Sequence, residues 1–487
     1  MTKPYIVLSK QEKAALHSRQ LGEISPFDAG IPLVDASDKV LEEIYYFRWH
    51  TYCKHIRPAD EGWVVTEFYP QVPWAGKYNT ISCPAGHHLY EGRWLHNGKY
   101  LPSYARFWFT PEAQPRKYSF WAADAVYAWC MTVGDFSLAE ELYDSLKANY
   151  AAWEEEKGME NGLFYQLDKR DGMEYSAGGS GCRPTINSYM YGDAVALSKI
   201  AARLGRVDEA AAWREKAAAL REKINAMLWD EDAAFYKTLS EENNYEKTDM
   251  RELCGYVPWC FGVPDSEEKA AAWKFLNDEN HFYAPYGPTT TERCCPDFMK
   301  EFSHECLWNG PSWPFATSQT ITALGNLLCN YDQSVMTKHD YFALLRLFAG
   351  CHYLTENGKT VPFIDENLDP FTGRWLARDI LLANPIPKKV PGRGEDYNHS
   401  SFCDLVLSGL AGVRSRDDET LEIRPLFAAE DMDYFCADGI LYHGHTLCVL
   451  WDKDGSRYGK GPGFRVFCDR TELFTAETPC DFVKEPK

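Results

Sequence analysis

Residues 305–330 have the sequence ECLWNGPSWPFATSQTITALGNLLCN, a loop of glycine, proline and tryptophan that leads directly into a helical pattern. The apolar positions after Trp313 recur with the spacing of an amphipathic helix, which predicts a helix over residues 313–330. The loop places two tryptophans and an amide just before that helix. Residues 305–330 are therefore predicted to form a long aromatic loop followed by a helix.

The same helical spacing returns in pairs along the chain. Short turns join the helices of a pair, and longer loops rich in glycine and aromatic residues separate the pairs. This pattern predicts an α/α toroid, an all-α-dominated fold whose long loops on one rim build the site. A solenoid of tetratricopeptide type would show a short fixed period, which this sequence lacks. Helices are expected over residues 118–132, 136–157, 187–204, 208–228, 313–330, 340–353 and 400–410.

The two ends of the chain differ from this helical middle. Residues 1–115 look irregular and rich in aromatics, with strand-like alternation over 63–70. After residue 413 an alternating pattern predicts strands that are separated by Asp-Gly and Gly-Pro turns. We therefore expect an irregular N-terminal segment (1–115) that contributes loops, a catalytic barrel (116–412) and a small β appendage (413–487). The strands of the appendage are expected over residues 420–426, 441–451 and 463–467.

Composition narrows the class of partner. Hydrophobic residues make up 45% of the 487 residues and aromatic residues 15%, which suits both a large core and a carbohydrate site. The formal net charge of −20 disfavours nucleic acid as a partner. Neither an export signal nor an apolar run of about 18 residues occurs, so no membrane contact is expected. With 16 scattered cysteines, the reducing cytoplasm is the expected location.

A second loop, residues 364–373, has the sequence IDENLDPFTG and concentrates carboxylates. Cleavage of a glycosidic bond needs an acid that protonates the leaving oxygen and a carboxylate that acts from the other face of the sugar. Flat aromatic rings hold the sugar between them. Motifs for phosphate binding, for a zinc protease helix and for a serine hydrolase elbow do not occur. Paired acids beside tryptophans therefore indicate a glycosidase.

These loops carry a family resemblance. Residues 308–313, WNGPSW, with QTITAL at 319–324, resemble the second trehalase signature and the matching element of processing α-glucosidases and bacterial mannosylglycerate hydrolases. Those enzymes are inverting glycoside hydrolases on an (α/α)6 barrel. The stretch ENLDPFTG at 366–373 resembles their general-base element, with Leu368 where the family often has tyrosine. The resemblance implies Glu366 as general base, and neither a metal nor an organic cofactor.

The general acid of that family is an aspartate followed by an arginine and by a helix that contains asparagine. The stretch DGMEYS at 171–176, followed by Arg183 and Asn187, is similar and places Glu174 at the acid position. Glutamate replaces aspartate there, and residues 177–181 lengthen the loop, so Asp171 is the alternative acid. Burial against the neighbouring apolar side chains would keep Glu174 protonated near neutral pH.

The predicted reaction is hydrolysis of a terminal sugar from a small carbohydrate, exo-acting and inverting. A deep barrel mouth closed by loops favours short substrates over polymer interiors. The residues expected to bind the sugar are Trp308, Trp313, Asn309, Arg183, Asn187, His87, His88 and Trp121.

Four alternatives stay open. A glycoside phosphorylase would need an anion pocket, for which Arg374, Arg378 and His399 are candidates. A sugar epimerase would need paired histidines, and a non-catalytic protein would bind sugar without turnover. Some retaining β-L-arabinofuranosidases on a related barrel hold zinc with three cysteines and a glutamate, one cysteine being the nucleophile. Residues that invite that comparison here are Cys294, Cys295, Cys306, Glu292 and Glu305, although no Cys-x-x-Cys occurs.

Overall fold

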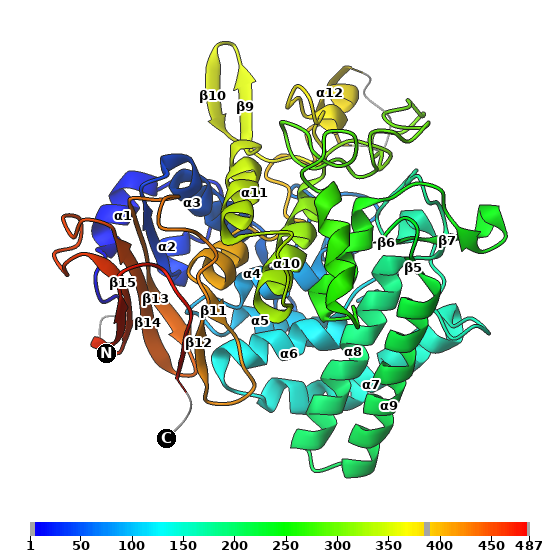
Figure 1. Ribbon diagram of the computed structural model, residues 1–487, viewed down its shortest axis with the longest axis horizontal. Coiled ribbons are helices and arrows are strands. Elements are labelled where there is room, and N and C mark those ends of the chain that lie inside the picture. Colours follow the sequence, from blue (N-terminus) through cyan, green and yellow to red (C-terminus); the bar gives the residue numbers. More distant parts are fainter. Residues whose placement is uncertain (1–4, 384–389, 485–487) are drawn as a thin grey trace.

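The computed structural model describes residues 5–383 and 390–484 (Figure 1). Helices make up more of the chain than strands, and the longer ones of the middle segment lie in consecutive pairs. No helix among the described residues carries an apolar stretch that could cross a bilayer. The paired helices are α6 (Ala122–Val133) with α7 (Ser137–Lys157), α8 (Pro184–Arg203) with α9 (Val207–Met227), η3 (Leu253–Phe261) with η4 (Glu267–Phe275), and α10 (Pro314–Asn330) with α11 (Lys338–Gly350).

The predicted helices of the middle segment are confirmed with shifted ends. Helix α6 begins at Ala122 rather than at residue 118, because Ser119 is held in a loop by a hydrogen bond to Asp171. Helix α8 begins at Pro184, which occupies the first helical turn, where proline is well tolerated. Thr337 closes a capping box at the start of α11. The helix expected over 400–410 is a short π-type turn, η5 (Leu405–Leu410).

Six helices and helical turns contact one another in the order in which they occur along the chain. Helix α4 (Ala85–Gly92) contacts α6, α6 contacts α8, α8 contacts η3, η3 contacts α10, and α10 contacts η5. The buried carboxylate of Glu91 in α4 accepts hydrogen bonds from the backbone N–H groups of residues 402–404, just before η5. The last of these six segments is thereby tied to the first.

The expectation that residues 1–115 are irregular was wrong. They contain a 16-residue helix, α3, of which most side chains are buried. A helix buried on several faces lacks the one-sided apolar spacing by which amphipathic helices are found in a sequence. The elements of this segment are α1 (Lys10–His17), α2 (Pro26–Ala29), β1 (Leu33–Ala36), α3 (Lys39–Lys54), β2 (Ile56–Ala59), β3 (Gly62–Val65), α4 and α5 (Tyr100–Phe107).

A five-stranded antiparallel sheet lies at one side of the molecule beside the N-terminal helices (Figure 1). Its order is β1, β13 (Tyr434–Tyr442), β14 (His445–Asp452), β15 (Gly463–Cys468) and β16 (Thr471–Ala476), and Leu33 lies opposite Asp438. The strand predicted over 441–451 is a hairpin, because His443 and Gly444 both take positive φ angles and turn the chain. A three-stranded sheet beside it contains β11 (Val413–Arg414), β12 (Leu421–Ile423) and β17 (Phe482–Lys484).

Short elements complete the described chain. Strands β9 and β10 form a hairpin that projects from the rest of the fold, near α12 (Figure 1). The loops between these elements and the neighbouring helices carry the candidate site. The bounds are η1 (Asp168–Arg170), β4 (Gly181–Cys182), β5 (Trp229–Asp230), β6 (Phe235–Tyr236), β7 (Leu239–Ser240), η2 (Glu241–Asn243), β8 (Glu246–Lys247), β9 (Tyr353–Glu356), β10 (Lys359–Pro362) and α12 (Leu376–Ala383).

Candidate active site

A cavity of about 220 Å³ lies where the loop before α8, the loop before α10, the loop after β10 and the segment before η5 meet. The predicted acid and base, Glu174 and Glu366, both line it, and so do Trp308 and Trp313. Four of the predicted residues therefore share one cavity. Its other polar and aromatic lining residues are Glu67, Phe68, Trp74, Tyr118, His304, Glu305, Cys306, Phe315, Arg393, Tyr397 and His399.

The loop that carries Glu174 is held by a buried ion pair. Arg183 is 0% exposed, and its Nε donates to Asp171 at 2.7 Å. The same guanidinium donates to the side chain of Ser176 and to the backbone of Gly179. Asp171 also accepts hydrogen bonds from Ser119 and Thr185, so it is occupied as an acceptor rather than free to donate a proton.

The environment of Glu174 suits a proton donor. Burial raises the pKa of its carboxyl to about 7, and the negative charge of Glu366 acts in the same direction. A backbone hydrogen bond of 3.0 Å from Trp308 to the carbonyl of Glu174 joins the acid loop to the tryptophan loop. Glu174 therefore holds a proton near neutral pH, as a general acid must.

Glu366 has the opposite environment. It is 2% exposed and forms an ion pair with Arg393, whose Nη2 lies 3.0 Å from Oε1. The Cys306 thiol donates to the other carboxylate oxygen at 3.3 Å. Both contacts place a hydrogen-bond donor on the Glu366 carboxyl, and Arg393 also brings a positive charge to it. Its neighbour Asn367 fixes the loop, since its side chain bonds to the backbone of Ala377 and of Glu305.

Several buried polar atoms of the residues that line the cavity have no hydrogen-bond partner among the described residues. They are Nε1 of Trp308, both ring nitrogens of His399 and Nη1 of Arg393. Burial, with His87 nearby, lowers the pKa of His399 well below its usual value, so its imidazole is neutral and offers one donor and one acceptor. Buried polar groups are rarely left unpaired, and sugar hydroxyls would complete these bonds. The rings of Trp308 and Trp313 stack at 4.4 Å between centroids and form one wall.

Four predicted sugar contacts need correction. Arg183 and Asn187 are 0% exposed and hold backbone and loop groups, and neither lines the cavity. Asn309 donates to the carbonyl groups of residues 297 and 300. His88 bonds to Tyr104 and to the backbone just before His399. Each of these polar side chains is buried and positions the chain behind the site.

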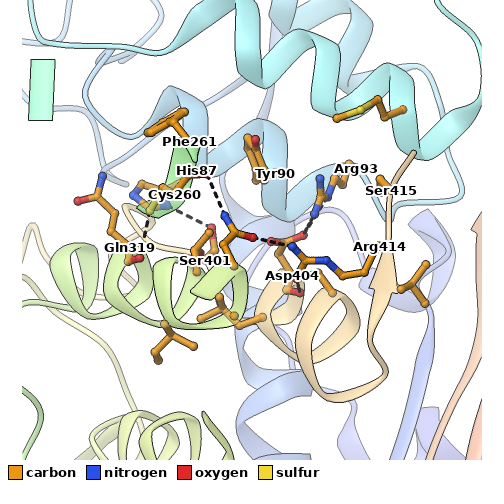
Figure 2. A pocket seen from close by; sticks show the side chains of 18 of the residues that line it. His87, Tyr90, Arg93, Cys260, Phe261, Gln319, Ser401, Asp404, Arg414 and Ser415 are labelled. Carbon is orange, nitrogen blue, oxygen red and sulfur yellow. Dashed lines mark hydrogen bonds and ion pairs between the residues drawn. The ribbon is translucent and has the colours of Figure 1, made fainter. Parts of the chain in front are cut away.

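The remaining two, His87 and Trp121, line a second cavity of about 170 Å³ (Figure 2). Figure 2 shows His87 beside Ser401, to which its Nδ1 is bonded at 3.1 Å. The ring of His87 lies 4.7 Å from that of Phe315, which lines the first cavity. A single layer of rings therefore separates the two cavities.

Sequence reasoning missed Glu67, Arg393 and Tyr397 at the site. Burial raises the pKa of Glu67 to about 8, against a hydrogen bond from Tyr397, and the charges of Glu366 and Glu174 raise it further. Glu67 lies in the strand-like stretch 63–70, and Arg393 in a charged loop, PGRGED at 391–396. Neither stretch carries a motif. The closely spaced rings of Tyr397 and His399 were the one feature of these stretches that could have indicated a binding site.

The alternative sites are not assembled as expected. Arg374 is paired with Asp379, and Arg378 with Glu356, and neither arginine lines the cavity. Their predicted anion pocket is therefore not formed.

The residues that invite comparison with a three-cysteine zinc site are also divided. Among the described residues, Cys294 groups with His281 and Glu292, whereas Cys306 groups with its neighbours His304 and Glu305. Burial raises the pKa of the Cys306 thiol well above its usual value, and Glu366 adds to the shift, so its thiolate is disfavoured.

Comparison with known proteins places this cavity in a family. Residues 77–400 match the mannosylglycerate hydrolase MGH1-like glycoside hydrolase domain. The chain belongs to this family. Residues 77–400 thus form a glycoside hydrolase domain of the MGH1-like family, and the resemblance drawn from the loops before α10 and after β10 is confirmed.

Solved structures share the fold of this chain. A protein named sialidase is 37% identical, with a TM-score of 0.90 over 99% of this chain and 45% of that one. A mannosylglycerate hydrolase of Thermus thermophilus, solved with glucose, is 14% identical, with a TM-score of 0.53 over 74% of this chain and 98% of that one. A rhamnosidase of a Bacillus species is 15% identical, with a TM-score of 0.54 over 87% of this chain and 40% of that one.

An uncharacterized Borreliella burgdorferi protein is 25% identical over 161 residues. The MGH1-like chain thus spans less than half the length of that protein, 32%, and of the sialidase, 45%.

Proposed function

We propose that this glycoside hydrolase removes a terminal sugar from a small carbohydrate by an inverting mechanism, with Glu174 as general acid and Glu366 as general base. The supporting observation is that two carboxyls line one cavity in opposite electrostatic settings. Burial holds a proton on Glu174, and Arg393 stabilises the charge on Glu366. Inverting hydrolases need this division between a protonated and an ionised carboxyl.

We infer that the fold is an (α/α)6 toroid. Its inner ring is formed by α4, α6, α8, η3, α10 and η5, each of which contacts the next, with Glu91 closing the ring. The loops that precede α8, α10 and η5 lie at one end of this ring and carry the cavity. Loops on one rim enclose a short substrate, which favours removal of a terminal sugar over cleavage inside a polymer.

In the proposed reaction Glu174 donates its proton to the glycosidic oxygen as the bond to the anomeric carbon breaks. Glu366 accepts a proton from water, and the resulting hydroxyl attacks the anomeric carbon from the opposite face. An inverting pair leaves room for this water at a carboxyl separation of about 6.5–9.5 Å. His399, Trp308 and Nη1 of Arg393 supply the unpaired polar atoms for sugar hydroxyls.

The test is a screen of the wild type, Glu366→Gln and Glu174→Gln against aryl glycosides, glycosyl fluorides and oligosaccharides. NMR of the first product identifies the released anomer. The base variant should lose activity on every substrate by about a thousandfold or more. The acid variant should lose most on sugar leaving groups and least on fluoride, because fluoride leaves with little help from an acid.

Each of the other possible results of this screen would support one of the alternative functions. A retained anomer would favour a double-displacement glycosidase, and cleavage that depends on phosphate would favour a phosphorylase. Interconversion of free sugars without release would favour an epimerase. Sugar binding without turnover, unchanged in Glu366→Gln, would leave a binding protein and overturn the proposal.

A further inference from the structure

An exposed aromatic surface lies directly outside the catalytic cavity. Tyr175 is 42% exposed, and its ring stacks on Phe302 with 4.9 Å between centroids and an angle of 21° between planes. The Tyr175 ring also lies 5.8 Å from that of His304, which lines the cavity. Tyr175 and Phe302, which we name the rim platform, therefore continue the cavity wall outward.

The backbone of Tyr175 is held in an unusual conformation. Its φ angle is +59°, in the left-handed region that residues with a large side chain rarely adopt. The Tyr175 N–H donates to Asp168, and the Glu174 carbonyl accepts from Trp308, so both polar groups of the peptide between Glu174 and Tyr175 are held. Strain of this kind persists where the surrounding structure enforces it and is concentrated at functional sites. The turn presents one large aromatic side chain to solvent.

The position next to Glu174 determines which part of a substrate the rim platform would meet. A general acid must lie within hydrogen-bond reach of the glycosidic oxygen, and that oxygen departs with the leaving group. A surface that follows Glu174 toward solvent therefore lies on the leaving-group side. The terminal sugar occupies the inner part, beside His399 and Trp313.

The charge of the cavity restricts the leaving group further. The described lining carries one guanidinium, that of Arg393, which pairs with two carboxyls, those of Glu305 and Glu366. Glu67 and Glu174 add no full charge near neutral pH, because burial raises the pKa of both carboxyls. Cations outside the lining are already engaged, among them Lys117, which donates to the backbone carbonyl of Trp74. Lys300, 5.6 Å from the Phe302 ring, is paired with Asp297, and Arg170 stacks on Tyr118. A carboxylate on the leaving group would meet an excess of negative charge.

We propose that the rim platform is a leaving-group subsite for an uncharged ring, such as a second neutral sugar or an aryl group, and that it selects against anionic leaving groups. Flat faces stack on tyrosine and phenylalanine, whereas a small acid such as glycerate offers no such face. The inference rests on the proposed acid and base, because they define the leaving-group side. It assigns the chain a neutral glycoside as substrate.

The experiment compares leaving groups on the one sugar that the screen above identifies. The 4-nitrophenyl glycoside, a neutral disaccharide and the glycosyl fluoride are assayed with the wild type, Tyr175→Leu and Phe302→Leu. Leucine keeps the apolar character and removes the flat face. Each variant should lose about three- to tenfold more in kcat/KM on the first two substrates than on the fluoride.

The matched control is Tyr245→Leu. Tyr245 is also a tyrosine at positive φ, +61°, and is 38% exposed, but it lies in the loop before β8, away from the cavity lining. Its substitution should leave the ratio between aryl and fluoride substrates unchanged. The glyceryl glycoside is then compared with the glycerate glycoside, and the neutral one should be cleaved about tenfold faster.

The outcomes separate this inference from the proposed function. If the rim variants lose activity equally on all leaving groups, or if glycerate is preferred, the subsite is overturned while the acid and base stand. If the wild type cleaves none of the substrates, the fluorides included, the proposed function falls and the inference falls with it.

Discussion

Arg183 and Arg393 are both buried, and both are paired with glutamate or aspartate, yet their surroundings differ. Every nitrogen of the Arg183 guanidinium has a partner, among them Asp171, Ser176 and a backbone carbonyl. Arg393 donates to Glu366 and Glu305 through Nε and Nη2, while its Nη1 has no partner among the described residues. The first arginine lies behind the acid loop, and the second lines the cavity.

The bonds of Arg183 give it a structural role, whereas Arg393 keeps one nitrogen that can bind a ligand. A completely bonded guanidinium has nothing left to offer a substrate, although its loss would leave a buried carboxylate without a counter-charge. A guanidinium with one free nitrogen at a cavity can bind a hydroxyl and stabilise charge during the reaction. Arg183 follows the loop of Glu174 as an arginine follows the general acid in the family. Its hydrogen bonds show that it holds this loop in place.

The largest effect is expected from Arg393→Lys. Lysine keeps the charge but not the fork that reaches Glu366, Glu305 and the cavity together. We expect kcat/KM to fall by about a hundredfold or more with little change in the unfolding midpoint. Steady-state kinetics and thermal unfolding check this. Activity within about threefold of the wild type would show that the free nitrogen has no role.

Arg183→Met tests the structural arginine. It would leave Asp171, which is 3% exposed, without its ion-pair partner. We expect a loss of about 3–5 kcal/mol in the free energy of unfolding, measured with urea. The control is Arg374→Met, because Arg374 forms a solvent-exposed pair with Asp379 and should cost at most about 1 kcal/mol. Equal costs at the two positions would contradict the comparison.

Glu67→Gln tests a cavity carboxyl that accepts its hydrogen bond from a tyrosine instead of an arginine. Its pKa is about 8 in the folded protein and near 4.5 when unfolded, so between these values only the folded state keeps the proton. The wild type therefore loses stability as pH rises through that window, by up to about 1 kcal/mol per pH unit. The variant does not titrate, so its advantage in Tm should grow from pH 5 to pH 8 and then level off. A constant difference would refute the assignment.

The smallest effect is expected from Cys306→Ser. The serine hydroxyl can also donate to Glu366, and the thiol is a poor nucleophile because its pKa is raised. Activity should stay within about tenfold of the wild type. Complete loss, together with retained anomeric configuration, would instead identify Cys306 as a nucleophile.

The sequence predicted the elements with local signals. The helix after Trp313, the helix pairs and the base loop could be located because helical spacing and a short motif are contained within a few residues. Helix α3 could not, since it is buried on several faces. Glu67, Arg393 and His399 meet the catalytic pair only through the fold, at positions far apart in the chain. His87 in α4 lines the second cavity (Figure 2), and Trp121, which directly precedes α6, lines it too. Both do so because of their places in the fold, which a motif does not specify.

Strand β1 has a consequence for how this protein is made. Leu33 pairs with Asp438, and the carboxylate of Asp438 also accepts the backbone N–H groups of residues 6–8. Residues 6–8 and β1 are thus synthesised long before the strand that they contact, β13. Contacts between residues so distant in sequence form slowly, because closing the long intervening loop costs conformational entropy before the contacts can stabilise the fold. Until then β1 is an unpaired strand edge, open to pairing with another chain.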